Sequence, residues 1–171
     1  MVMVVEQVSR RRRTGVALGY AVLSSLMLAG IFAGFLVAVL VLELSMRSAD
    51  GSVYTQVRKI ELVGLDALAS VTLLPAIATT AVVVFGRWLR RGAARWLPAA
   101  ALVLLAGVLV LSMLVNLPIN TDQQAWTVAS PPADWASVRD QWQLAHVVRV
   151  VLATIAFGAL GLAAIERRHD G

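Results

Sequence analysis

The sequence contains no cysteine. Disulfide bonds, thiolate metal ligands and cysteine nucleophiles are therefore excluded from its chemistry. It also lacks a glycine-rich phosphate loop and the nucleophile elbow of serine hydrolases. Its two halves show no convincing internal repeat, which disfavours an inverted-repeat transporter.

Charged residues are also scarce, at 15% of the 171 residues, whereas 59% are hydrophobic and the mean hydropathy is +0.79. A soluble domain is about 45–50% apolar, so this composition indicates a membrane protein. Four apolar segments reach the roughly 20 residues that a helix needs to cross a bilayer. We predict transmembrane helices at about 16–42, 62–86, 97–116 and 143–165. The expected fold is all-α, with residues 1–171 forming a single domain, an integral-membrane four-helix bundle in the lipid bilayer.

The basic residues, which give a net charge of +5, are distributed unevenly between the connections. The arginines of the N-terminal arm, the second connection and the C-terminal tail are Arg10, Arg11, Arg12, Arg13, Arg87, Arg90, Arg91, Arg95, Arg167 and Arg168. By the positive-inside rule, both termini are cytoplasmic, as in a bacterial-type plasma membrane. Most acidic residues fall on the opposite, external side. Because membrane insertion accounts for the basic charge, we do not expect nucleic-acid binding.

The third connection, residues 117–142, is longer than a simple turn and is predicted to be external. Its stretch SPPAD is a helix-start signal, in which Ser130 or Asp134 can act as the cap. A helix from Asp134 to about Ile165 would be about 48 Å long, against about 30 Å of hydrocarbon. Its first turns must therefore project from the membrane.

One face of this last helix carries Trp135, Arg139, Trp142, His146 and Arg149, at steps of four, three, four and three residues. These steps place all five side chains on one side of an α-helix. The stripe is expected to run from water into the lipid boundary, with Arg149 one turn deeper than His146. His146 is the only histidine outside the C-terminal tail.

The other helices bring polar groups to the same level. Glu43 ends the first segment, and Tyr54, Arg58 and Glu61 share one face of the second, with Asp66 slightly deeper. We expect the carboxylates of these two helices to pair with the arginines of the fourth, because unpaired ions near hydrocarbon are costly.

Asn116 and Asn120 align at the end of the third segment only if the helix continues past Pro118, which usually ends or kinks a helix. On the first segment, Gly30 and Gly34 form a GxxxG pattern of the kind that lets helices approach closely.

These groups suit removal of a proton from a flat aromatic substrate. His146 can act as a base near neutral pH, indole rings offer stacking surface, and Arg139 or Arg149 can stabilise a phenolate or enolate. Other interpretations stay open: Arg149 in a structural ion pair, Trp135 and Trp142 as interfacial anchors, a metal held by His146 with Glu43, Glu61 or Asp66, or a haem with His146 as axial ligand. We expect no cofactor.

The stretches VNLPINTDQQAW and PPADWASVRDQWQLAHVVR resemble the four-helix membrane family of anthrone oxygenase-like proteins, whose bacterial members have long been known only as a domain of unknown function. The family pattern falls on Asn116, Pro118, Asn120, Trp126, Trp135, Arg139, Trp142, His146 and Arg149. The upstream YTQVRKIELVGLDALASVTLLPAI is similar to the family's second helix, so the resemblance spans nearly the whole chain.

The resemblance implies a membrane-bound, monooxygenase-type oxidoreductase that oxidises a hydrophobic aromatic or polycyclic substrate with molecular oxygen, as fungal members oxidise anthrones to anthraquinones without a recognised cofactor. The catalytic candidates are His146, Arg149, Arg139, Asn116 and Asn120. The substrate-binding candidates are Trp126, Trp135, Trp142, Glu61 and Tyr54.

Two other functions remain as alternatives. One is a non-enzymatic membrane module that binds a lipid, a quinone or a partner protein through the same pocket. The other is a transporter or channel subunit, for which the sequence offers neither repeats nor a polar stripe through the whole membrane. A homo-oligomer is compatible with either.

Overall fold

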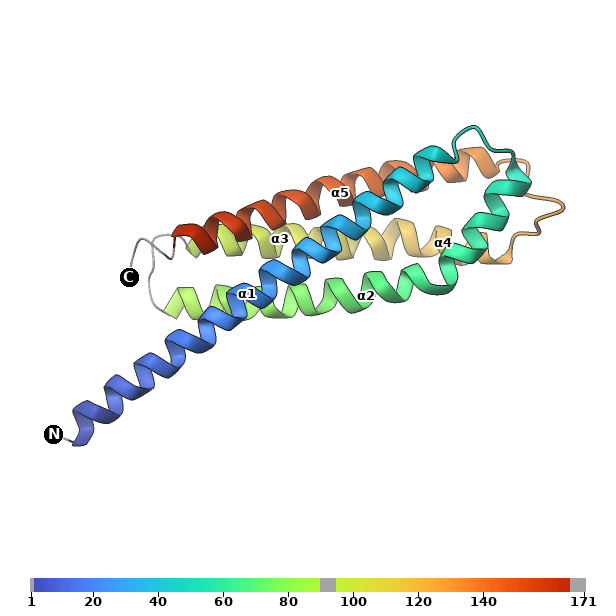
Figure 1. Ribbon diagram of the computed structural model, residues 1–171. Helices are drawn as coiled ribbons and strands as arrows, with labels where there is room; N and C mark the ends of the chain where they lie inside the picture. The colour runs from blue at the N-terminus through green and yellow to red at the C-terminus, as the bar shows by residue number, and fades with distance from the viewer. Residues whose placement is uncertain (1, 90–94, 167–171) are drawn as a thin grey trace.

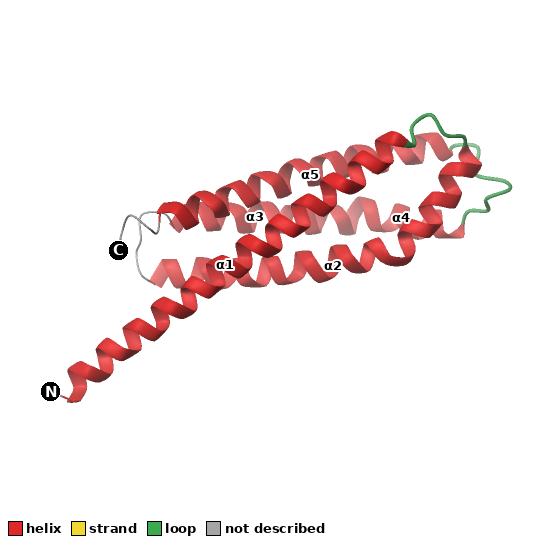
Figure 2. Ribbon diagram, in the orientation of Figure 1, coloured by secondary structure: helices red, strands yellow, loops and turns green. Residues whose placement is uncertain are grey.

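The computed structural model describes residues 2–89 and 95–166, with side chains described from residue 14 onward. The elements in chain order are α1 (Val2–Ser45), α2 (Gly51–Leu89), α3 (Trp96–Leu111), the π-helix η2 (Ser112–Asn116), α4 (Leu117–Ala125) and α5 (Trp135–Glu166). Within these two ranges there is no strand, only an isolated bridge between Thr127 and Ser130. Figures 1 and 2 show the helices side by side in one bundle, with α1 crossing it obliquely.

Four helical stretches are long and apolar enough to span a membrane: Thr14–Ser45, Gly51–Leu89, Trp96–Ala125 and Trp135–Glu166. The prediction of an all-helical fold with four helices long and apolar enough to span a membrane is therefore confirmed for the described residues. Each stretch is longer than the apolar segment predicted for it, because polar turns extend the helices beyond the hydrocarbon-like residues. At the start of α2, for example, Asp50 Oδ1 accepts hydrogen bonds from the backbone N–H groups of Ser52 and Val53, both at 2.9 Å, which caps the helix eleven residues before the predicted segment.

The bounds predicted for the third connection, residues 117–142, are wrong, and the helix continues past Pro118, which the sequence left open. The helix continues from α3 through η2 and α4 to Ala125, and the connection to α5 comprises only residues 126–134 instead of 117–142. Pro118 lies in the first turn of α4, directly after the π-helix. The wider turn of a π-helix changes the hydrogen-bond register at that point, so proline there does not end the helix.

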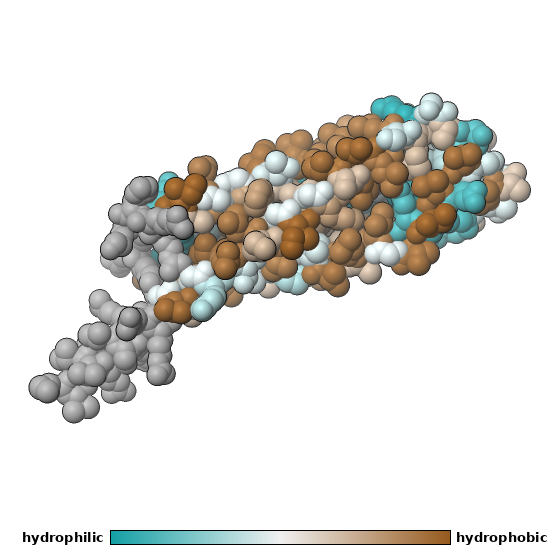
Figure 3. Space-filling view, viewed as in Figure 1, coloured by the Kyte–Doolittle hydropathy of each residue, from teal (hydrophilic) through white to brown (hydrophobic). Residues whose placement is uncertain are grey.

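Small residues fill the space between the helices, and large apolar side chains cover the outside. The buried core cluster includes six alanines, Ala29, Ala33, Ala76, Ala101, Ala153 and Ala156, together with Phe32, Leu36 and Leu105. Large side chains such as Val63, at 87% exposed, and Leu114, at 72%, lie on the outer surface. Figure 3 shows this surface as mostly hydrophobic along the bundle, with hydrophilic residues gathered at one end. Helices that pack together in lipid have this arrangement, with small residues between the helices and large apolar residues on the outside.

The hydrophilic end carries the two short connections, residues 46–50 and 126–134, and is named the loop end below (Figure 1). Trp88 and Trp96 lie toward the opposite end and pack edge to face, 5.5 Å apart, with the guanidinium of Arg95 over both rings. The side chains of Arg10 to Arg13, and residues Arg90, Arg91, Arg167 and Arg168, lie outside the described residues. Which end faces the cytoplasm therefore stays a prediction of the charge count.

Of the two glycines in the GxxxG pattern, only Gly30 is at a helix contact. A Cβ atom at Gly30 would lie 2.9 Å from Phe157 Cε2 of α5, whereas one at Gly34 would meet nothing within 4 Å. We expect Gly30→Leu to destabilise the bundle by about 1–3 kcal/mol through overpacking, and Gly34→Leu to have little effect. Thermal unfolding of the two variants in the same detergent checks this difference. Equal melting temperatures would contradict the close contact.

Candidate functional site

A cluster of polar side chains is buried inside the bundle near the loop end, between otherwise apolar helices. The cluster comprises Glu43 of α1; Arg58 and Glu61 of α2; Asn116, Asn120 and Gln123 of the third helical stretch; and Trp142, Gln143, His146 and Arg149 of α5, each no more than 7% exposed. Three residues of the predicted α5 stripe, Trp142, His146 and Arg149, therefore face inward among acids and amides of the other helices, whereas Trp135 and Arg139 lie outside this cluster. The catalytic roles of these residues stay predictions.

Arg58 is the centre of the hydrogen bonds in this cluster. Its Nη1 lies 2.8 Å from Glu61 Oε2 and 3.1 Å from Glu43 Oε1. Its Nε donates to Gln123 Oε1 at 3.0 Å and its Nη2 to Asn120 Oδ1 at 2.9 Å. The guanidinium also lies 4.3 Å from the centre of the Trp142 ring, within cation–π range.

The expected pairing of carboxylates with arginines of the fourth helix is therefore wrong. Glu43 and Glu61 both pair with Arg58, a cation of α2 itself. Arg139 pairs with its neighbour Asp140 at 3.0 Å and donates to the backbone oxygen of Arg47. The reason is local: Arg58 and Glu61 are three residues apart on one helix face, so this ion pair forms without any requirement on how α2 and α5 pack.

The continuation of the third helix through η2 gives Asn120 a central position. Asn120 Nδ2 donates to Asp66 Oδ1 at 2.8 Å, and Trp142 Nε1 donates to Asn120 Oδ1 at 2.7 Å. One turn earlier, Asn116 Nδ2 lies 3.4 Å from the backbone oxygen of Trp142. Both asparagines thus face α5, as predicted for an uninterrupted helix, and they tie α2, α4 and α5 together.

His146 is fully buried and its ring orientation is fixed on two sides. The imidazole stacks on Trp142, with ring centres 4.7 Å apart and planes 9° from parallel, and Nε2 lies 2.9 Å from the backbone oxygen of Leu36. A carbonyl oxygen only accepts, so Nε2 carries the hydrogen. Nδ1 of the neutral ring is then a free lone pair, and it is buried with no hydrogen-bond partner. The ring is therefore held with its basic nitrogen available.

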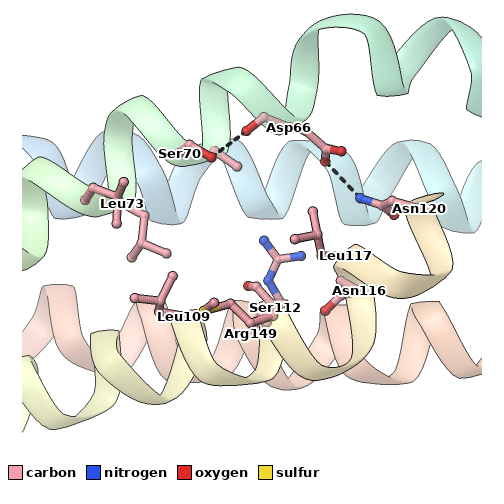
Figure 4. Close-up of a pocket in the computed structure, with 12 residues that line it drawn as sticks. Asp66, Ser70, Leu73, Leu109, Ser112, Asn116, Leu117, Asn120 and Arg149 are labelled. Carbon is pink, nitrogen blue, oxygen red and sulfur yellow. Dashed lines mark hydrogen bonds between the residues drawn. The ribbon is translucent and has the colours of Figure 1, made fainter.

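Arg149 differs from Arg58 and Arg139, which both form ion pairs. It is 7% exposed, and among the described residues it forms no ion pair or hydrogen bond; its Nε is buried without a partner. Asp66 is the carboxylate whose charge acts on it. Figure 4 shows its guanidinium extending into the space between α2 and the third helical stretch.

This space is a cavity of about 140 Å³, the outer cavity. Its polar lining is Asp66, Ser70, Ser112, Asn116, Asn120 and Arg149, and its apolar lining includes Leu73 and Leu109 (Figure 4). Leu74, Met113 and Leu117 line it too and are about half exposed on the outer surface of the bundle. The outer cavity therefore lies next to the surface that lipid would cover.

A second cavity of about 30 Å³, the inner cavity, lies deeper in the cluster. It shares Asp66, Ala69, Asn120 and Arg149 with the outer cavity, and its remaining polar lining is Arg58, Glu61, Trp142 and His146. The two cavities are thus neighbours, and Arg149 belongs to the wall of both.

Four of the predicted site residues line neither cavity. Tyr54, Trp126 and Met46 form a small buried cluster at the loop end, against which Trp135 packs. Trp135 lies 5.6 Å from the Tyr54 ring and beneath the guanidinium of Arg139 at 5.0 Å. These aromatic rings cover the polar cluster on its loop-end side, and Tyr54 reaches it through a hydrogen bond from Gln123 Nε2 to its hydroxyl at 3.3 Å. Their roles in substrate binding and catalysis stay predictions.

Sequence reasoning did not assign roles to Arg58, Gln123 or Gln143. Gln143 Nε2 donates to Glu43 Oε2 at 3.1 Å, so both glutamines belong to the network around the acids. For Arg58, the sequence did offer a signal, namely its spacing from Glu61 on one helix face. For Gln123 the sequence offered no signal, because the predicted third segment ended before it.

The alternative metal set of His146, Glu43, Glu61 and Asp66 also stays a prediction. In the described part of the chain, no three histidine or acidic side chains gather closely enough to hold an ion. The carboxylates of Glu43 and Glu61 instead share Arg58.

Residues 66–159, more than half of the chain, match the family model described as anthrone oxygenase. The matched range contains Asp66, both asparagines, Asn116 and Asn120, and the three α5 residues that line the cavities, Trp142, His146 and Arg149. No curated protein and no solved structure matches the chain.

Proposed function

The chain belongs to the anthrone oxygenase family, and on that premise we propose that it is a membrane-bound oxidoreductase which oxidises a hydrophobic aromatic substrate with molecular oxygen in the outer cavity. The termini face the cytoplasm in this proposal, so the cavity lies toward the external side. The substrate arrives from the lipid.

The observation that carries the proposal is the state of Arg149. A buried guanidinium without an ion pair is costly inside a membrane, by a few kcal/mol on insertion scales. A protein retains such a group where a ligand supplies the missing hydrogen-bond or charge partner. An enolate or phenolate oxygen in the outer cavity is such a ligand, and it develops its charge only as the substrate is deprotonated.

The size and position of the outer cavity support an aromatic substrate. At about 140 Å³ it is close to the roughly 150 Å³ of an apolar cavity that binds benzene, so it accommodates about one ring. The half-exposed side chains at its edge, Leu74, Met113 and Leu117, allow the rest of a larger polycyclic molecule to remain among the lipids. Asn116 and Asn120 can orient the substrate's carbonyl or hydroxyl groups.

The reaction begins with removal of a proton from the CH₂ group of an anthrone, which lies across the central ring from the ketone and is conjugated to it through the aromatic rings. His146 Nδ1 is the acceptor, directly or through one water, and Arg149 stabilises the enolate oxygen. The enolate carbon forms a bond to O₂, which is reduced by two electrons to a peroxide and takes up the proton. Loss of the second C–H proton with cleavage of the O–O bond gives a ketone and water. The sum is R₂CH₂ + O₂ → R₂C=O + H₂O, so no further reductant is required.

Replacing His146 with alanine tests the base. We expect His146→Ala to lower the turnover of anthrone by at least about 10²-fold, the lower end of what a positioned general base contributes. Leu144→Ala, which changes a lipid-facing side chain of the same helix at 69% exposure, is the matched control and should keep its activity. Anthraquinone formation, corrected for the protein-free reaction, is the measurement. Unchanged turnover in His146→Ala would remove this residue from the mechanism.

A further inference from the structure

The inner cavity brings together three buried polar atoms that have no hydrogen-bond partner. These are His146 Nδ1, Glu61 Oε1 and Arg149 Nε, and all three side chains line the cavity. One is a free lone pair, one a carboxylate oxygen and one an N–H donor. In a folded protein such groups are nearly always satisfied, by protein or by ordered water.

The cavity has the size and chemistry of a water site. Its volume of about 30 Å³ accommodates one or two water molecules, and a buried water needs two to four polar partners. A water there can donate to His146 Nδ1 and to Glu61 Oε1 and accept from Arg149 Nε. An apolar occupant would leave all three atoms unsatisfied, and each would lose its hydration without gaining a partner.

The inner cavity reaches one of two acids that share a cation. Glu43 of α1 and Glu61 of α2 both contact the guanidinium of Arg58, and all three side chains are buried. The other charged or titratable groups near these acids are Tyr54 and Asp66 of α2 and Arg139, His146 and Arg149 of α5. Of Glu43 and Glu61, only Glu61 lines the inner cavity. The Glu43 carboxylate accepts a hydrogen bond from Gln143 instead.

We propose that water in the inner cavity bridges His146 Nδ1 and Glu61 Oε1, and that Glu61 is the proton store of the reaction. This catalytic part depends on the proposed function. The proton that leaves the substrate carbon passes to His146 Nδ1, then through the water to the Glu61 carboxylate. It returns by the same route to the peroxide formed from O₂. During the step with oxygen, no proton then has to cross the aromatic rings of Tyr54, Trp126 and Trp135 at the loop end. Glu61 thus acts through His146 as a positioning and proton-storing residue.

The kinetic test compares Glu61→Gln with Glu43→Gln. Both variants remove one negative charge from the same guanidinium, but only the first changes the wall of the inner cavity. We expect Glu61→Gln to lower kcat for anthrone by about 10²-fold with little change in KM, and to change the solvent deuterium isotope effect on kcat. Glu43→Gln should retain kcat within about threefold. Equal kcat values and isotope effects in the two variants would overturn the relay.

A second measurement needs no substrate. The chain has two histidines, so ¹⁵N-labelled protein carrying His169→Gln reports on His146 alone. We expect the Nδ1 signal of a hydrogen-bonded acceptor, shifted toward the unbonded position in Glu61→Gln and unchanged in Glu43→Gln. An unbonded signal in the parent protein would overturn the water bridge. If the bridge is observed but anthrone is not oxidised, the proposed reaction fails while the water site stands; if anthrone is oxidised equally by both variants, the reaction stands and the relay fails.

Discussion

Replacing Arg149 with methionine is expected to abolish most of the activity without weakening the fold. The guanidinium forms no ion pair or hydrogen bond within the described residues and lies in the walls of both cavities. If it stabilises the enolate, its loss should lower kcat/KM for anthrone by about 10²–10³-fold, the effect of removing one donor to a developing oxyanion. Methionine has a similar length and carries no charge, so the desolvation cost of the cation disappears. The melting temperature should therefore stay the same or rise.

This pair of results separates a functional arginine from a structural one. If Arg149 held the helices together, its substitution would lower the stability of the protein, because the partner of the arginine would be left buried and unpaired. Activity and thermal unfolding of Arg149→Met should be measured on the same preparation, with Arg149→Lys as the charge-conserving control. A marked drop in melting temperature, together with normal kcat/KM in the protein that remains folded, would show that Arg149 serves the bundle and not the reaction.

Replacing Arg58 with methionine is expected to have the opposite profile, with a large loss of stability. Arg58 neutralises Glu43 and Glu61 and donates to Gln123 and Asn120. Its removal leaves two carboxylates buried without a cation, and breaking a buried pair in this way costs about 3–5 kcal/mol. We expect a large decrease in melting temperature or a failure to accumulate in the membrane.

The matched control for Arg58→Met is Lys59→Met. The adjacent lysine donates to the backbone oxygen of Gln124 from an exposed position, and its loss should cost less than about 1 kcal/mol. Adding Glu43→Gln and Glu61→Gln to Arg58→Met should restore part of the stability, because the uncompensated charges are then gone. Normal melting of Arg58→Met alone would show that the acids are neutralised by some other means.

Which side chains point into the bundle was predictable from spacing alone. The steps of four and three residues from Trp135 to Arg149 place that stripe on one face of α5, and a helix in lipid buries its polar face. The four membrane-spanning helices followed in the same way from the length of the apolar segments. Both predictions depend on local periodicity, which tertiary packing leaves unchanged.

The pairing of charges and the shape of the third helix were not predictable. Three arginines were within plausible reach of Glu61, and the choice of Arg58 depends on side-chain directions that sequence spacing does not define. The π-helical turn at Ser112–Asn116 widens the helix without a compositional signal, so the sequence left open whether the helix continues past Pro118. Because the helix continues beyond this turn, Asn120 and Gln123 reach Arg58. The hydrogen bonds at the centre of the polar cluster could therefore be recognised only from the structure.

Oxygen uptake by the purified protein in lipid, with anthrone as substrate, tests the central claim most directly. The protein should consume O₂ faster than protein-free bilayers, with one O₂ used for each anthraquinone formed, and Arg149→Met should fall back toward the protein-free rate. A folded wild-type protein that consumes no more oxygen than the bilayers across anthrone and related aromatic ketones, yet retains a bound lipid or quinone, would contradict the account and indicate a binding module instead.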